Sequence, residues 1–258
     1  MNEDLKSINL FGIRIDKVDL SYVLNWIERK ISGKQKFPYY IVVVNVAKLI
    51  KARKDPKLRR IINTADLVGA DGVPLIWISK LLGNPIPGRV CGIDLMEELL
   101  AIGCQKNWSF FLLGAKDEVI HKVVDILKSK HPNLRISGFH HGYFSNNEEK
   151  KIVDMINQSK ADILFIGFGT PKKEYFVERW RKELNVKIIH GVGGSFDVIA
   201  GVTKRAPKWM QKTGLEWFFR LMQEPRRMWR RYLVTNSAFV FLVIKKLFKY
   251  FWDPKKFE

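Results

Sequence analysis

The most informative segment of the sequence runs from Ile188 to Pro207 and reads Ile-Ile-His-Gly-Val-Gly-Gly-Ser-Phe-Asp-Val-Ile-Ala-Gly-Val-Thr-Lys-Arg-Ala-Pro. The apolar run from Val186 to Ile189 predicts a buried strand. Three glycines then allow a tight turn and leave backbone N–H groups uncovered: Gly191, Gly193 and Gly194. Ser195 is placed to cap a helical turn over residues 196–200.

A strand, a glycine turn and a helix N-terminus together form a common anion site, because unpaired N–H groups and the helix dipole both point at the ligand. The alternative is a plain connection between a strand and a helix. The spacing is not G-x-G-x-x-G, since Phe196 stands at the third glycine position. It is not a Walker loop, since no Gly-Lys-Ser/Thr follows.

The composition indicates one large domain, or one domain with an appendage, and an anionic partner. The chain has 258 residues, 47% of them hydrophobic, and a net charge of +19. Two cysteines, Cys91 and Cys104, do not suggest a disulfide framework. The N-terminus lacks the pattern of a signal peptide, and no apolar run reaches the roughly 18 residues of a spanning helix.

Strand-like and helix-like segments alternate along the first 204 residues. A strand-like start with a likely turn at Gly12 is predicted over residues 8–15, and short apolar strands over residues 40–44, 65–68, 109–113, 134–138, 163–167 and 186–189. Amphipathic helical segments separate most of them. This alternation predicts an α/β fold: a Rossmann-like, mostly parallel sheet with helices on both faces.

Polar residues follow several of these strands. Ligands of open α/β sheets gather beyond the carboxyl ends of the strands, so Asn45 is well placed for binding, although it equally fits a helix cap. Asp71 follows another strand within Ala-Asp-Gly, where a structural turn is the alternative. Arg89 either clamps a phosphate or lies on a solvated loop.

Two further loops have informative residues. His140 and His141 are adjacent, which is poor spacing for a metal site, and we predict no metal there. The strongest strand runs into Phe168-Gly-Thr-Pro-Lys-Lys-Glu174, where a glycine turn, an early proline and two lysines fit phosphate binding.

The composition changes after residue 204. From Arg205 onward there are thirteen Lys and Arg residues against four acidic ones, with aromatic residues interleaved. We predict a domain over 1–204 and a basic helical appendage over 205–258, with helices over 215–223 and 226–252 separated at Pro225. The apolar centre of the second helix is too short to span a membrane.

Basic ends, aromatic flanks and an apolar centre favour a helix lying in the interface of an anionic membrane. Packing on the chain's own domain, or a homo-oligomer, is the second possibility. Nucleic acid would use the same charge, but the long aliphatic runs disfavour it, and we expect no nucleic-acid partner.

In their order, these stretches resemble the WecG/TagA/CpsF glycosyltransferases (glycosyltransferase family 26). The resemblance covers nearly the whole chain. It rests on Asn45 and on these segments: 65–72, 89–94, 141–144 (His-Gly-Tyr-Phe), 167–174, 190–200, 205–207 and 214–225. No single piece is decisive, but the ordered set is specific.

The resemblance implies an inverting enzyme that moves a sugar from a UDP-sugar to a sugar carried on a polyprenyl diphosphate at the cytoplasmic membrane face. Members build teichoic-acid linkage units and other surface polysaccharides. The family's proposed general base falls on Asp71. The candidate binding residues are Asn45, Arg89, Tyr143, Gly169, Lys173, Gly193, Gly194, Ser195, Asp197, Arg220, Arg226 and Arg227.

Inversion needs one base for the acceptor hydroxyl and stabilisation of the leaving diphosphate. The chain contains no Asp-x-Asp, so we expect no metal or other cofactor, with arginines and glycine turns in the metal's place. Arg220, Arg226 and Arg227 are the candidates to reach a diphosphate. The chain departs from the family pattern at Val43 and Lys173, where a compared member has Thr and Gln; Lys173 either adds charge near the diphosphate or points to solvent.

Two other classes fit parts of the pattern. A UDP-sugar-binding accessory subunit without activity is the main alternative, against which the retained Asp71 speaks. An NAD-dependent enzyme would share the sheet pattern, but the dinucleotide fingerprint and its acidic partner are absent.

Overall fold

The structure, a computed structural model, describes residues 5–252, without the side chains of residues 227, 231 and 249–252. The elements of the first half are β1 (Ser7–Leu10), β2 (Ile13–Asp16), α1 (Leu20–Ser32), β3 (Tyr39–Val44), α2 (Val46–Lys54), α3 (Pro56–Asn63), β4 (Leu67–Ala70), α4 (Val73–Leu81), α5 (Gly92–Lys106), β5 (Ser109–Gly114) and α6 (Asp117–Lys130). Those of the second half are β6 (Arg135–His140), η1 (Asn146–Glu148), α7 (Glu149–Ser159), β7 (Ile163–Gly167), α8 (Lys172–Trp180), β8 (Ile188–Gly191), α9 (Ser195–Ile199), α10 (Lys208–Lys212), α11 (Glu216–Gln223) and α12 (Pro225–Trp252).

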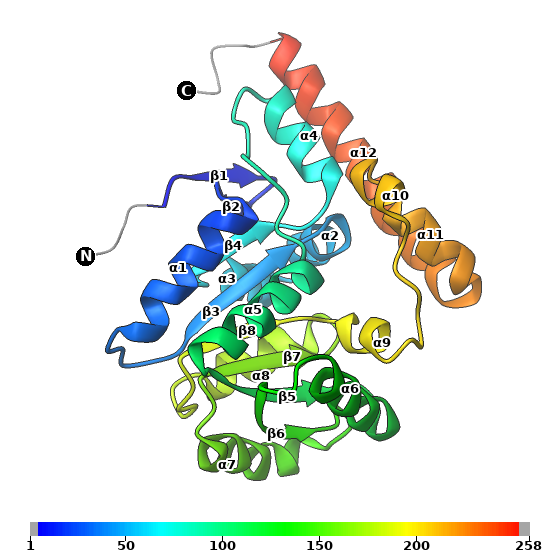
Figure 1. Cartoon of the computed structure of the whole chain (residues 1–258). Helices are drawn as coiled ribbons and strands as arrows, with labels where there is room; N and C mark the ends of the chain where they lie inside the picture. Colours follow the sequence, from blue (N-terminus) through cyan, green and yellow to red (C-terminus); the bar gives the residue numbers. More distant parts are fainter. Residues whose placement is uncertain (1–4, 253–258) are drawn as a thin grey trace.

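The main sheet has six strands in the order β4-β3-β8-β7-β5-β6, and every neighbouring pair is parallel. Figure 1 shows the strands running through the centre with helices in front and behind. The predicted Rossmann-like α/β architecture is therefore confirmed.

Alternating side chains of the strands belong to two separate hydrophobic cores, one on each face of the sheet. In β3, Tyr40, Val42 and Val44 join the cluster beneath α2, α3, α7 and α8, whereas Ile41 and Val43 join the cluster beneath α1, α5 and α6. Successive side chains of a strand point to opposite faces, so one buried strand contributes to both layers. The near-continuous apolar strands of the sequence are explained by burial on both faces.

The N-terminal segment forms an antiparallel hairpin, β1–β2, outside the main sheet. Gly12 turns it with φ +92°, a conformation that favours glycine. The buried Asp16 carboxylate accepts a hydrogen bond from the Val68 backbone at 2.7 Å, which fixes the hairpin to β4. Residues 8–15 were predicted as a strand-like start with a likely turn at Gly12, and the structure has two paired strands that meet at this turn.

The glycine stretch differs in detail from the prediction. Strand β8 covers Ile188–Gly191, two residues later than predicted, so Gly191 ends the strand and Gly193 makes the turn with φ +58°. The expected Ser195 cap was wrong: Gly194 is the N-cap, and the Ser195 hydroxyl donates to the Val192 carbonyl at 2.7 Å. The later strand end moves the helix start so that Ser195 already lies in its first turn.

The C-terminal helices pack on the sheet domain. Helix α12 contacts α2 and α11, and Phe239 inserts into the same core cluster as β3, with its ring edge-on to Phe11 at 6.0 Å. Arg205 anchors the connection from α9 by ion pairs to Asp94 and Glu97 on α5. Within residues 5–252, no helix has the length and hydropathy needed to cross a membrane. A domain boundary at 204/205 stays a prediction.

Candidate active site

The polar loops of the sequence meet at one edge of the sheet. Because all six strands are parallel, their carboxyl ends lie at the same edge, and all of them except β5 are followed by a candidate segment. Asn45 follows β3, Asp71 follows β4 and the Gly193–Gly194 turn follows β8. Residues 168–171 follow β7, and the loop with Tyr143 follows β6. The fold therefore gathers at one place residues that are up to 150 positions apart.

Asp71 is held firmly where β4 ends. Its backbone N–H donates to the Val44 carbonyl at 2.7 Å, and Gly72 follows with φ +135°. The carboxylate is partly buried, with Oδ1 3.4 Å from the Arg89 Nε. Burial raises the pKa of Asp71 and nearby Glu216 adds to the rise, whereas positive charges led by Arg89 oppose it. A raised pKa makes this carboxylate a stronger base than an exposed aspartate.

Arg89 connects the sheet edge to the C-terminal helices. Its Nη2 donates to the Glu216 Oε2 at 2.8 Å, and its Nη1 donates to the Gln211 carbonyl at 3.3 Å. Glu216 Oε1 lies 3.8 Å from the Arg220 Nη2. The Arg89 side chain is 19% exposed, so it does not lie on a solvated loop, and its role as a phosphate clamp stays a prediction. Asp71, Arg89, Glu216 and Arg220 form an alternating row of charges.

Asn45 caps α2, because its side chain accepts a hydrogen bond from the Lys48 backbone N–H at 2.9 Å. The capping alternative for this residue is confirmed, and a contact with substrate stays a prediction. The cap fixes the first turn of α2. Lys48 lies in this turn, and its ammonium group pairs with Glu174 in the helix that follows β7.

Sequence reasoning did not identify the buried ion network behind the glycine turns. Glu174 Oε1 lies 3.1 Å from the Lys48 Nζ and 3.4 Å from the Lys173 Nζ. It also accepts a hydrogen bond from the Thr170 hydroxyl at 3.1 Å. Lys173 is 5% exposed, so its expected solvent-facing alternative is wrong. A Cβ on Gly191 would meet the Lys173 stem at 2.7 Å, which explains a glycine there.

The pKa values in this network follow from burial and charge. Burial alone would raise the pKa of Glu174, but Lys48 and Lys173 outweigh it and bring the pKa to about 2. Burial and the like charge of Lys48 lower the pKa of Lys173 to about 8, against the pull of Glu174. Two lysines and one carboxylate leave one positive charge in excess near the sheet edge.

His190 lies behind the same edge on β8 and is fully buried. Its Nε2 is 3.2 Å from the Gly92 carbonyl oxygen. Burial lowers the pKa of His190 to about 4, so the ring is neutral at physiological pH. A neutral, buried imidazole between β8 and α5 is a packing element with one fixed hydrogen bond.

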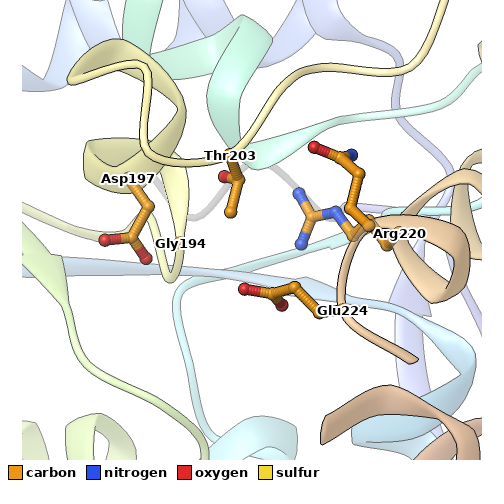
Figure 2. Close-up of a pocket in the computed structure, with 6 residues that line it drawn as sticks. Gly194, Asp197, Thr203, Arg220 and Glu224 are labelled. Carbon is orange, nitrogen blue, oxygen red and sulfur yellow. The ribbon is translucent and has the colours of Figure 1, made fainter. Parts of the chain in front are cut away.

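A pocket opens between the glycine turn and α11, as Figure 2 shows. Its lining residues are Gly194, Asp197, Thr203, Arg220, Gln223 and Glu224. Gln223 fixes one wall, because its amide exchanges hydrogen bonds of 2.8 and 2.9 Å with the Lys204 backbone. Three of the predicted binding residues therefore share one pocket. One guanidinium and two carboxylates in it suit a ligand with both phosphate and hydroxyl groups.

The remaining predicted residues lie around this edge. Tyr143 is 70% exposed on the loop after β6. A Cβ on Gly169 would meet nothing within 4 Å, so the backbone there is open to a ligand. Arg226 is exposed at the start of α12. The side chain of Arg227 lies outside the described residues. In the described part of the chain, no three His, Cys, Asp or Glu side chains are grouped to hold a metal ion.

The fold and this edge define an α/β protein with a polar, charged site beyond the carboxyl ends of its parallel strands, and comparison with known proteins gives the family. The model of the Glycosyl transferase WecG/TagA/CpsF family matches residues 8–251, and the chain belongs to this family. It is 34% identical to the N-acetylglucosaminyldiphosphoundecaprenol N-acetyl-beta-D-mannosaminyltransferase of Bacillus subtilis (strain 168), over 86% of each chain. It is also 34% identical to the protein of the same name from Bacillus spizizenii, over 80% of this chain and 79% of the relative.

Proposed function

We propose that this protein is an inverting glycosyltransferase that moves a sugar from a UDP-sugar to a polyprenyl-diphosphate-linked sugar acceptor. The donor sugar is an N-acetylhexosamine, for which the relatives' N-acetylmannosamine is the first choice; its uronic acid and a hexose follow. The acceptor is an N-acetylglucosamine on undecaprenyl diphosphate, as in the relatives' names. One observation carries this proposal: Asp71 stands at the sheet edge in an ion pair with Arg89.

In the proposed reaction, Asp71 takes the proton from the acceptor hydroxyl while the oxygen of that hydroxyl attacks the anomeric carbon of the donor sugar. The bond to the UDP oxygen breaks on the opposite face, which inverts the configuration. The raised pKa of Asp71 favours proton transfer to its carboxylate. Arg89 orients that carboxylate and keeps it ionised.

The leaving diphosphate is the second requirement, and the charged and polar groups that line the pocket of Figure 2 support a role in binding it. Arg220 and the backbone of the Gly194 turn face a bound diphosphate, while Asp197 and Glu224 accept hydrogen bonds from sugar hydroxyls. Arg226 and Arg227 extend the positive charge along the start of α12. We propose that these groups stabilise the leaving UDP without a metal ion.

We further propose that the protein works as a peripheral protein on the cytoplasmic face of the membrane, with α12 in the interface. The outward side of α12 supports this role, since exposed Trp229, Phe241 and Phe248 accompany exposed Arg226 and Arg230. A lipid-linked acceptor requires an enzyme that reaches the bilayer surface.

The test is transfer from a panel of UDP-sugars to a short-chain polyprenyl-diphosphate-linked N-acetylglucosamine. The rate is measured as UDP release. One donor is expected to give turnover that survives chelator. Turnover abolished by chelator and restored by Mg²⁺ or Mn²⁺ would contradict the metal-free part. UDP binding without turnover on any donor would favour the non-catalytic accessory subunit.

A further inference from the structure

Helix α4 leaves large apolar side chains uncovered. Trp77 and Leu81 are 58% and 52% exposed and lie one helical turn apart on the same face. The opposite face of α4 is anchored, because Leu75 and Ile78 are buried in the core. A helix that is apolar on its outer side as well as its inner side needs a further apolar partner.

The outer side of α12 repeats this pattern. Its exposed apolar residues recur at helical spacing: Trp229, Leu233, Val240, Ile244 and Phe248. Its inner side is fixed by the buried Met228 and Phe239. In the described residues 5–201, the other large apolar side chain that is comparably exposed is Tyr143. The exposed large apolar side chains of the sheet domain are thus concentrated on α4.

The two helices belong to the same side of the molecule. Residues of both pack against one core cluster, which holds Leu75 and Ile78 of α4 and Phe239 of α12. The loop before α11 closes on the start of α4, where a Cβ on Gly214 would lie 3.0 Å from the Val73 Cβ. Figure 1 draws α4 and α12 together at the end of the molecule beyond β4.

Charge identifies the occupant of this surface. Neither α4 nor α12 contains an Asp or Glu. The exposed cations on them are Lys80, Arg226, Arg230 and Lys245. A second copy of the chain would place these cations against one another, whereas an anionic bilayer meets them with opposite charge. Tryptophan and phenylalanine beside lysine and arginine are the composition of a membrane interface.

We propose that α4 is a second membrane-contacting element, which inserts Trp77 and Leu81 into the interface of an anionic bilayer together with α12. The inference rests on the membrane role proposed for α12 and extends it to the sheet domain. Helix α4 begins directly after Asp71 and Gly72, and its nine residues span about 14 Å. The bilayer contact therefore sets the height of the proposed base above the lipid surface.

The experiment places a fluorophore that responds to solvent polarity on the full chain. Leu81→Cys carries the label, and Lys128→Cys on the outer side of α6 is the matched control, each with Cys104→Ser because Cys91 is buried. The probe is a vesicle of phosphatidylcholine and phosphatidylglycerol with brominated acyl chains. The label at position 81 is expected to shift to the blue and to be quenched, while the label at position 128 does neither.

Three results would overturn the proposal in distinguishable ways. Vesicle binding with an unchanged label at position 81 would leave α12 as the membrane element and refute α4. A blue shift that needs no vesicles and grows with protein concentration would mean that a second copy covers α4. Absence of vesicle binding would refute both membrane roles, while transfer to a water-soluble acceptor would still test the proposed reaction separately.

A second variant measures the size of the effect. Trp77→Ser combined with Leu81→Ser is expected to weaken partitioning into the anionic vesicles roughly tenfold, because it removes two apolar side chains from the interface. Turnover on the water-soluble acceptor should stay unchanged. The control, Lys122→Ser with Lys128→Ser on α6, should keep its partitioning. Equal partitioning of both variants would contradict the assignment.

Discussion

Glu174 is the residue on which the buried charges of the site depend. Its carboxylate is the partner of both Lys48 and Lys173. Glu174→Gln would leave two buried ammonium groups uncompensated and is expected to cost about 3–5 kcal/mol of unfolding free energy. Lys173→Gln keeps the Lys48 pair and should cost clearly less. Urea denaturation at neutral pH measures both, and equal losses would contradict this division of roles.

The ion pairs of Glu174 with Lys48 and Lys173 also predict a pH dependence of stability. The folded-state pKa of Glu174 is about 2, below the 4.5 of an unperturbed glutamate. A carboxyl with a lowered folded pKa stabilises the protein above its unfolded pKa and loses that contribution as the pH falls. The stability advantage of wild type over Glu174→Gln should therefore shrink between pH 4.5 and pH 2. An advantage constant over this window would show that the charge of Glu174 is not its source.

Asp71 predicts the pH dependence of activity. The proposed base works only when ionised, and burial raises its pKa. The acidic limb of kcat/KM is therefore expected above the roughly 3.9 of an ordinary aspartate. A pH series of initial rates measures it. A limb at or below the ordinary value would mean that a different group, or an unperturbed Asp71, accepts the proton.

Single residues also show where sequence reasoning reaches its limit. The position of Asp71 beyond a strand follows from local periodicity, and so does the glycine turn before Asp197. The partner of Arg89 is Glu216, 127 positions away, and no local pattern announces that pair. Lys48 and Glu174 are likewise brought together by the β3–β8–β7 neighbourhood, which depends on topology.

At the scale of elements, the ends of β5 and β7 approach too closely for a side chain. Gly114 has φ +147°, and a Cβ there would lie 2.6 Å from the Gly167 Cα. Gly114→Ala should therefore lower the unfolding free energy by at least about 2 kcal/mol. Gly169→Ala is the matched control, since its Cβ would meet nothing within 4 Å and its stability should be kept. Thermal unfolding measures the stability of both variants beside wild type. Equal stability of the two variants would contradict the close approach at Gly114.

The elements were predicted well where periodicity is local. The parallel strands, their intervening helices and the break at Pro225 all follow from short-range patterns. Strand ends were less well predicted, because they depend on pairing: β8 extends to Gly191 through its parallel partner β7, so Ser195 lies past the cap position. The turn at Gly12 was predicted, whereas the docking of the β1–β2 hairpin to β4 was not, because it joins segments that are distant in the sequence.

At the scale of the whole molecule, α12 is attached to the sheet domain through few deep contacts. Phe239 is 8% exposed and packs edge-on to Phe11. Phe239→Ala is expected to lower the free energy of α12 opening by about 3 kcal/mol, as for large-to-small core changes. Hydrogen exchange should then show faster exchange in α12 with an unchanged central sheet. Uniform loss of protection across the sheet would instead make α12 part of the same cooperative unit.

The charge row from Asp71 through Arg89 and Glu216 to Arg220 joins the proposed base to the proposed donor pocket, so the account depends most on Asp71. The most direct measurement is the rate of UDP release with the preferred donor and a short-chain lipid-linked acceptor, for wild type beside Asp71→Asn. If Asp71 is the base, the kcat of Asp71→Asn is expected to fall about 100-fold or more, with UDP binding retained. Undiminished turnover in Asp71→Asn would contradict this role and leave Asp197, which lines the proposed donor pocket, as the next candidate base.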